Sequence, residues 1–459
     1  MAYSLTGFDT YYGTEPWSGI DRKTIPYYVP DLAEQFRRHN VYAQFATFAV
    51  SMLQNNAESM SFTEIYDLDY DKSTIDNRAL WLSTQYFDSR QISIDCASYG
   101  GKVSLHKYDP LVTYWRQSGG DIRNIARGAL GLSMTQQIDE LTRDAFLDSP
   151  YWMLSGHTSD VVSASGYPDF STIEATDLFD PDDAAKIWLL MDDMQVPGAN
   201  DPNGLGGRVM FAITSHNVWY DLIKPSADNT FKDNLVTLQS PMIMNYEMGQ
   251  YLNTRYIKTP LAVLWNCGTI TAQTTLSADI AIGSGAAATV NGHYTVGQTA
   301  LRTSSENSDV GARYITVAST TGFTAGDIIT IHQTRTSAFG VTNGVDYREG
   351  TLTNRRVVAV IDETTMSLDK PILKVEYVQG NWVTKAIHIN ATIFIGGPRG
   401  VVWAVTQAPA IYTPPVVDDR MAQWRCSWDM TSKAQIFKPE FCHVVYSAAS
   451  SAERLISTH

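Results

Sequence analysis

The sequence has few cysteines and no long apolar segment. Its four cysteines, Cys96, Cys267, Cys426 and Cys442, lie far apart and form no CxxC pair, which favours reduced thiols over a disulfide framework or a zinc site. No run of about 18 apolar residues occurs, and the first residues carry neither the basic nor the apolar stretch of a signal peptide. We therefore expect a chain that is made and folded in a cytoplasm and has no membrane partner.

Sequence motifs of catalysis and metal binding are also absent. There is no GxSxG, GxxxxGK[ST] or HExxH, and the nine histidines are scattered singly. We expect no catalytic residues, no cofactor-binding residues and no metal ligands, and hence no cofactor.

Two partial motifs fail at decisive positions. Residues 283–288 fit the GxGxxA dinucleotide fingerprint, but Asn291-Gly292 interrupts the chain before a helix could receive a pyrophosphate. The alternating acids of residues 67–71 resemble the start of a calcium loop. Lys72 stands where the turn glycine belongs, however, and Arg78 where the bidentate glutamate belongs. A small-residue loop and a solvated acidic loop explain these stretches better.

Basic residues are outnumbered by acidic ones, 34 against 48, which gives a net charge of −14. Such a surface repels nucleic acid, so sequence-specific DNA binding is not expected. With 44% hydrophobic and 18% charged residues, the composition is that of a globular protein, and 459 residues are enough for two or three domains.

Residues 121–148 are predicted to form the longest helix. Asp121 can cap its start, Ser149-Pro150 ends the pattern, and Asp139 and Arg143 form an i,i+4 pair expected on the outer face. At ~1.5 Å per residue the helix would run roughly 40 Å, which suits a spine lying across a sheet. Its apolar residues recur at helical spacing and form one stripe: Ile122, Ala126, Leu130, Met134, Ile138, Leu141 and Ala145.

Before this helix, the residue pattern of the chain changes twice. Residues 1–30, rich in Tyr, Gly, Thr and Pro, indicate an extended aromatic arm, and Pro30 to Leu53 is predicted to be helical. Glu58 to Lys107 contains short alternating runs around turn-like segments such as Tyr99-Gly100-Gly101. We predict a long β-hairpin or extended loop there.

After the long helix, the pattern is that of an α+β domain. Asp180-Pro181 is a strong helix start, Arg208 to Thr214 indicates a buried strand, and Val218 to Ile223 a short helix. Residues 254–259 and 261–265 are strand-like.

From Gly268 to Lys385 helix signals vanish. Short strands separated by turn residues have the spacing of a small β-barrel or sandwich, so we predict an inserted all-β domain. Strand patterns at Ile387 to Ile395 and Val401 to Val405 then indicate a return to the sheet of the host domain.

This order of elements resembles the HK-97-type major capsid protein of tailed bacteriophages. Asn245 to Thr259 looks like the Glu-x-Gly … Arg-φ-φ-x-Thr segment of the N4-like and crAss-like coat proteins, and Asp139 to Trp152 is similar to the end of their spine helix. The resemblance implies an α+β, HK-97-like capsid fold with an inserted all-β domain. Its parts would be an N-terminal arm and helix (1–57), an extended loop (58–108), a peripheral domain with the spine helix (109–165), an axial domain (166–267), the β insertion (268–385) and a return to the axial and peripheral sheet (386–459).

The function implied by the resemblance is that of a structural protein, not an enzyme. Such a protein assembles with itself into hexameric and pentameric capsomers of an icosahedral virion shell, which encloses the phage genome and forms in the host cytoplasm. Scaffold, portal and decoration proteins would be its further partners. Some family members cross-link a loop lysine to a C-terminal asparagine; here Lys102 and Lys107 are available, but no asparagine follows Asn390.

Two other functions remain open at this point. A carbohydrate-active enzyme or binding module is suggested by the β insertion and by the 11% aromatic residues. Another oligomeric phage structural protein, such as a tail or sheath subunit, would form tubes or rings instead of shells.

Overall fold

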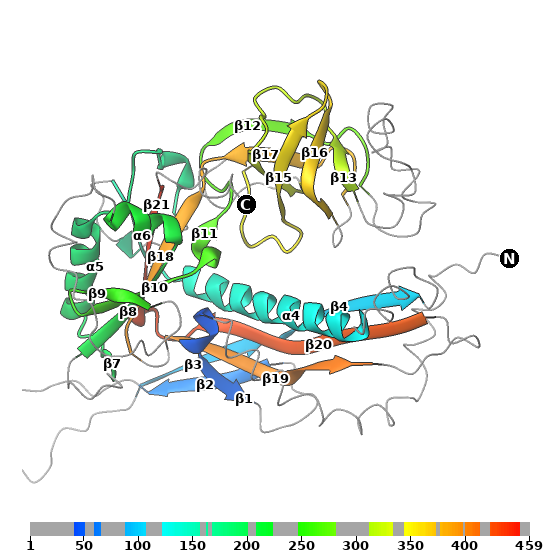
Figure 1. Ribbon diagram of the computed structural model, residues 1–459. Helices are drawn as coiled ribbons and strands as arrows, with labels where there is room; N and C mark the ends of the chain where they lie inside the picture. Colours follow the sequence, from blue (N-terminus) through cyan, green and yellow to red (C-terminus); the bar gives the residue numbers. More distant parts are fainter. Residues whose placement is uncertain are drawn as a thin grey trace, which may run out of the picture. The chain divides into compact units, whose positions relative to one another are not determined.

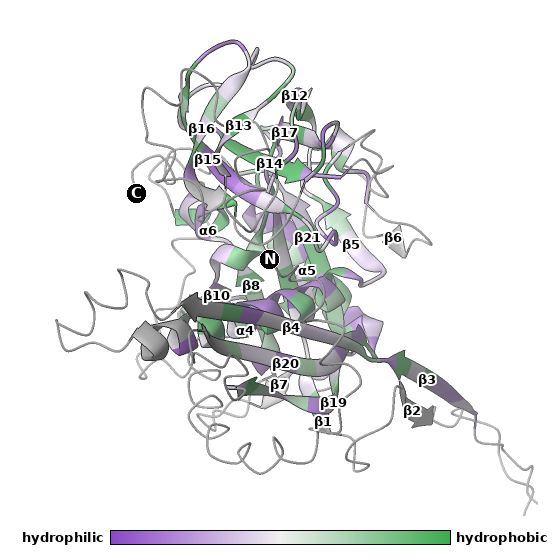
Figure 2. Cartoon of the chain, turned by 90° about the vertical axis from the view of Figure 1, so that its right-hand side faces the viewer, coloured by the Kyte–Doolittle hydropathy of each residue, from purple (hydrophilic) through white to green (hydrophobic). Residues whose placement is uncertain are grey.

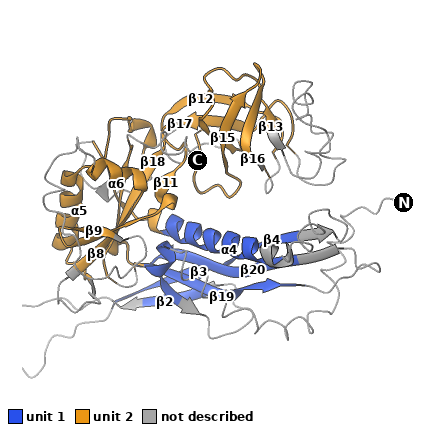
Figure 3. Cartoon of the chain, viewed as in Figure 1, with its two compact units in different colours: residues 1–145, 401–437 blue, residues 146–400, 438–459 orange. Residues whose placement is uncertain are grey.

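The computed structural model describes the chain in two compact units (Figure 3). Unit 1 combines residues 1–145 with 401–437, and unit 2 combines 146–400 with 438–459. The fold is mixed α+β, as predicted. The residues described are 41–50, 59–65, 88–106, 122–156, 162–163, 168–200, 208–223, 247–280, 312–333, 344–372, 377–397, 400–413 and 423–449.

The long helix predicted at residues 121–148 is confirmed as α4 (Ile122–Leu147). Leu130, Met134 and Ile138 of the predicted stripe are 5%, 0% and 1% exposed, and Leu141 packs against the same core. These four residues face side chains of a four-stranded sheet, so their periodicity indicates the buried side correctly. Those partners are Trp403, Val405, Cys426, Trp428 and Met430.

The sheet beneath α4 draws its strands from both ends of the chain (Figure 1). Its order is β1-β19-β20-β4, with β1 parallel to β19 and the other neighbours antiparallel. Side chains alternate across a strand, so Trp403 and Val405 face the helix while Val402 and Ala404 face the other side. The strands are β1 (Thr47–Val50), β4 (Ala97–His106), β19 (Val401–Tyr412) and β20 (Gln423–Ile436).

A two-stranded hairpin covers part of that other side. It consists of β2 (Ser59–Ile65) and β3 (Ser89–Asp95), paired antiparallel. The hairpin or extended loop predicted over Glu58 to Lys107 is too long, because β4 at its end pairs with β20 of the sheet instead. Ile94 of β3 is 1% exposed and packs with Val402, Ala404 and Phe437. The hairpin is therefore fixed to unit 1 by the base of its apolar side.

Two predictions in unit 1 are wrong. Within the predicted helix at 30–53, the described residues form a 3-10 turn, η4 (Tyr42–Gln44), and strand β1; the rest of that range lies outside the described residues. The apolar pattern of 47–50 is satisfied by pairing with β19, which no helical period could reveal.

Tyr99-Gly100-Gly101, expected to be a turn, instead lies inside β4. A Cβ on Gly101 would lie 2.9 Å from Nε1 of Trp428, so a large indole on the neighbouring strand explains the glycine.

Unit 2 is built on a nine-stranded sheet with the order β6-β5-β21-β18-β8-β10-β9, to which β7 and β11 attach. The predicted strand β8 (Arg208–Thr214) and helix α6 (His216–Ile223) are confirmed, as is α5 (Pro181–Asp193) with its capping box between Asp180 and Asp183. Both helices pack on a core that includes Tyr256 and Phe394. The other strands are β5 (Tyr151–Leu154), β6 (Val162–Ser163), β7 (Ala199–Asn200), β9 (Glu247–Tyr251), β10 (Thr254–Lys258), β11 (Val263–Leu264), β18 (Ile389–Ile395) and β21 (Cys442–Ser447).

Residues between β11 and β18 contribute a second sheet to unit 2, with the order β12-β17-β14-β15-β16-β13. A bridge between Leu276 and Val317 joins its two end strands, so the sheet closes into a small barrel around its own apolar core. Figure 2 shows β14 as hydrophobic and a hydrophilic stretch on β15. The strands are β12 (Ile270–Thr275), β13 (Ala312–Thr316), β14 (Ile328–His332), β15 (Thr353–Val360), β16 (Thr365–Ile372) and β17 (Trp382–Ala386).

The chain enters and leaves the barrel at adjacent positions. Gly268 N donates to Ile387 O at 2.9 Å, and Ile387 N donates to Thr269 O at 3.0 Å. Next to them Asn266, fully buried and with a φ of 56°, donates from Nδ2 to Thr330 Oγ1 at 2.8 Å and accepts from Ala386 N at 2.9 Å. The junction is thus a hydrogen-bonded joint and not a loose tether.

Candidate assembly surfaces

Within the described residues, no group of three or more His, Cys, Asp or Glu side chains could hold a metal ion. The partial motifs at 67–71 and 283–288 lie outside the described residues. Two of the buried histidines serve the fold: His388 Nδ1 accepts from Asn266 N at 3.1 Å, and His443 Nε2 lies 3.1 Å from Glu440 O. Burial lowers the pKa of each imidazole to about 4, so both are neutral at pH 7.

The four cysteines are free thiols. Cys267, Cys426 and Cys442 are buried, and Cys96 is half-buried. Burial raises the pKa of the Cys426 and Cys442 thiols above the ordinary value, which makes them unreactive at neutral pH. They belong to the packing of the two units.

The structure offers incompletely covered surface for contact with other molecules. Along the hairpin, Met60, Phe62 and Ile92 are only half-buried, while the reverse side is polar and exposed. Among the described residues, β2 and β3 pair only with each other, and two-stranded ribbons are marginal alone in water. The hairpin can therefore accept a further packing partner along its apolar side.

Large apolar side chains are also exposed elsewhere. In unit 1, Phe48 and Leu132 are 54% and 50% exposed. In unit 2, Leu252 lies at the turn between β9 and β10 with a φ of 46° and is 39% exposed. Single exposed apolar residues are normal on monomers, so these positions are contact candidates only together with the hairpin.

The predicted position of Asp139 and Arg143 on an outer face is wrong. Asp139 is 2% exposed, and its Oδ1 accepts hydrogen bonds from Tyr42 N at 2.8 Å and Ala43 N at 3.2 Å. Arg143 is 9% exposed and pairs with Asp144 at 2.7 Å. Because the partners of Asp139 lie 97 and 96 residues earlier in the chain, no helical spacing could have indicated them.

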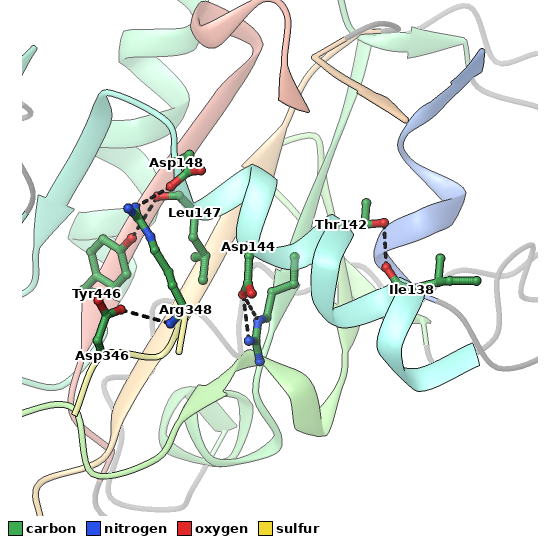
Figure 4. Close-up of polar contacts among 9 residues, drawn as sticks. Ile138, Thr142, Asp144, Leu147, Asp148, Asp346, Arg348 and Tyr446 are labelled. Atoms are coloured by element: carbon green, nitrogen blue, oxygen red, sulfur yellow. Dashed lines mark hydrogen bonds and ion pairs between the residues drawn. The ribbon is translucent and has the colours of Figure 1, made fainter. Parts of the chain in front are cut away.

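The end of α4 is joined to the barrel within unit 2. Arg348 binds the carboxylate of Asp148, and the Tyr446 hydroxyl donates to Leu147 O at 3.4 Å (Figure 4). A cation at a helix C-terminus is favourable because the helix dipole is negative there. Asp346 supports the loop by accepting from Arg348 N at 3.0 Å.

Comparison with known proteins gives similarity of structure alone. No family profile matches the sequence, and no curated protein is similar to it. Phage capsids are among the solved structures that are similar. The cyanophage Pam1 capsid is similar over 90% of this chain and 93% of its own, with a TM-score of 0.45 and 10% identity. The capsid of Ralstonia phage GP4 is similar over 90% and 92%, with a TM-score of 0.47 and 9% identity. The head of Helicobacter pylori bacteriophage KHP40 is similar over 88% and 87%, with a TM-score of 0.45 and 10% identity. At these identities no residue's role is transferred to this chain.

Among the described residues, no helix is both long and apolar enough to span a membrane.

Proposed function

We propose that this chain is a major capsid protein of the HK-97 type, which assembles with itself into the icosahedral shell around a phage genome. The observation that carries the proposal is the arrangement of helix and strands in unit 1. A long helix lies on a sheet made of an N-terminal strand, the strand that follows a hairpin, and two C-terminal strands. The same order of arm, loop, spine helix and returning sheet underlies the sequence resemblance.

The hairpin explains how such a subunit would associate. Its half-buried apolar side, and strand edges that no other described strand pairs with, favour contact with another copy. Stable association of this kind needs on the order of 1,200–2,000 Å² of buried surface. A segment that becomes ordered on binding costs conformational entropy, which lowers the affinity of each contact, but it allows a large surface to be covered. The protein would act through these contacts, as a structural protein and not as an enzyme.

The charge of the chain fits a container. A net charge of −14 disfavours adhesion to packed DNA, so the genome would be enclosed without sequence-specific binding. Hexameric and pentameric capsomers, with scaffold, portal and decoration proteins as additional partners, belong to the same proposal. The proposal also includes a location in the virion, assembly in the host cytoplasm and a relationship to the N4-like and crAss-like coat proteins.

The domain assignment is part of the proposal as well. In it, residues 1–57 and 58–108 reach neighbouring subunits, 109–165 hold the spine helix, and 166–267 with 386–459 form the axial and peripheral sheet. Residues 268–385 form a guest module on the outer face, since a folded module inside would compete with DNA for volume. The adjacent bonds of Gly268 and Ile387 support an insertion at this point.

Electron microscopy of the purified protein, alone and with its scaffold, tests the proposal. Capsomers or closed shells would support it. Tubes or rings would favour a tail or sheath subunit, and a small oligomer with glycan affinity would favour the carbohydrate-binding alternative.

A further inference from the structure

Asn266 lies between the host sheet of unit 2 and the barrel. It follows β11, which pairs with β18 of the host sheet, and stands shortly before Gly268, where the chain enters the barrel. Asn266 is fully buried, and its φ of 56° is left-handed, a conformation that asparagine tolerates better than most residues. A polar side chain buried to this degree costs free energy unless its amide finds hydrogen-bond partners.

The amide of Asn266 finds its partners on the barrel. Oδ1 accepts from Ala386 N at 2.9 Å, at the end of β17. Nδ2 donates to Ile328 O at 3.1 Å and to Thr330 Oγ1 at 2.8 Å, both on β14. The Thr330 hydroxyl in turn donates to Asn354 Oδ1 of β15 at 2.6 Å. One side chain at the joint is thereby bonded to two barrel strands directly and to a third through Thr330.

The backbone of Asn266 is bonded on the host side. Its N donates at 3.1 Å to Nδ1 of His388, which precedes β18 and packs edge-on against Trp265 with ring centroids 4.8 Å apart. The segments that enter and leave the barrel also cross closely, since a Cβ on Gly268 would lie 2.9 Å from Ile387 O. The crossing segments therefore have little space in which to slide, and Asn266 is bonded to both sides of the joint.

The barrel has other attachments to its host. Thr269 Oγ1 donates to Ser171 O at 3.1 Å, and Arg348 binds the carboxylate of Asp148. Thr269 is exposed, and the side chain of Asp148 is 49% exposed. Water competes for such surface bonds, so each contributes little. The bonds of the Asn266 amide are buried, and water does not compete for them in the same way.

We propose that Asn266 is a positioning residue that fixes the orientation of the barrel on its host sheet. Hydrogen bonds are directional and are stronger in a low-dielectric interior than at a surface, so a buried, bonded amide favours one arrangement over its neighbours. Apolar contacts are not directional and would tolerate a range of angles. The consequence for a shell, that every barrel projects at the same angle, rests on the proposed function. The orientation itself does not.

Distances between two spin labels test the proposal on the full-length, unassembled chain. The labels are attached at Glu363→Cys on the barrel and at Leu189→Cys on α5, both exposed positions. The background is Cys96→Ser, because the other three cysteines are buried. We expect one narrow distance distribution when Asn266 is present and a roughly twofold broader one in Asn266→Gly, because the loss of the bonds populates further orientations. Glycine adopts the left-handed backbone freely, so this variant removes only the side chain.

Matched variants separate the side chain from the backbone. Asn253 has the same φ of 56° but is exposed at the turn between β9 and β10. Asn253→Gly therefore makes the same backbone change away from the joint and should leave the distribution narrow. Thr330→Val removes one partner of Asn266 from the barrel side and keeps the shape of the side chain. It should broaden the distribution, but less than Asn266→Gly does.

Amide exchange shows whether both parts stay folded. The amides of Val357 in β15 and Ile213 in β8 should keep their wild-type protection in every variant. Should Asn266→Gly lose the protection of the barrel, Thr330→Val decides the outcome by the same measurement. Equal widths in wild type and in these two variants would overturn the proposal, as would a broad wild-type distribution. Since no assembly is required, a failure here is separable from a failure to form shells.

Discussion

Arg348 of the barrel binds the carboxylate of Asp148, the residue that follows the long helix α4, across 200 positions of sequence. The side chains are 26% and 49% exposed, so solvent screens the pair and its contribution to stability is at most about 1 kcal/mol. The pair therefore joins the barrel to the end of α4 only weakly.

Replacing residues 268–385 with a short Gly/Ser linker should leave the rest of the subunit folded. The reason is that Gly268 and Ile387 are already hydrogen-bonded neighbours, at 2.9 Å, and the barrel has its own apolar core. Imaging should show shells of normal geometry that lack a surface protrusion. Insoluble or unfolded product would instead mean that the segment belongs to the core of unit 2.

Two glycines of unit 1 should respond to alanine in opposite ways. Gly101→Ala should destabilise the protein by about 1–3 kcal/mol because its Cβ would lie 2.9 Å from the Trp428 indole nitrogen. Gly128→Ala, in α4 with nothing within 4 Å of the new Cβ, should stabilise it by up to about 1 kcal/mol. Denaturant titration measures both changes. Equal stability of Gly101→Ala and wild type would contradict the packing of Trp428 on β4.

The sequence predicted those elements whose interacting residues lie close together in the chain, and missed those whose partners are distant. The stripe of Leu130, Met134 and Ile138 repeats within one helix, so local periodicity was sufficient to find α4 and its buried side. Strand β1 and Asp139 could not be found in this way, because their partners, β19 and Tyr42, lie far off in the chain. No sequence motif indicated a functional site. The half-buried side of the hairpin could be recognised only in the structure, because it depends on which residues of β19 and its neighbours pack against the hairpin.

Acid should weaken unit 2. Burial holds the pKa of His388 and His443 at about 4, below the 6.5 of an unfolded histidine. Stability from the neutral imidazoles is present above pH 6.5 and is lost as pH falls toward 4, at about 2–3 kcal/mol each by pH 4.5. Thermal unfolding between pH 7 and 4.5 measures the loss. His443→Phe, which keeps a ring beside Tyr151, should reduce the slope; an unchanged slope would exclude this histidine as a source.

Mature particles should be held together without covalent links between subunits. An isopeptide of the lysine–asparagine kind needs an acceptor in the C-terminal sheet, and no asparagine follows Asn390. Lys102 is exposed on β4, so a donor lysine is present and the acceptor is what the sequence lacks. A denaturing gel of boiled, reduced particles should show one band near 50.9 kDa. A ladder of higher bands would refute the prediction.

The central claim is self-assembly through surfaces that a single subunit leaves uncovered. Its most direct measurement is the sedimentation of the full-length protein and of a variant without residues 1–29, under the same assembly-promoting conditions, with imaging of each fraction. The full-length chain should sediment as capsomers or closed shells, while the truncated chain should remain a folded, unassembled subunit. A full-length chain that stays a single monodisperse monomer would contradict the account.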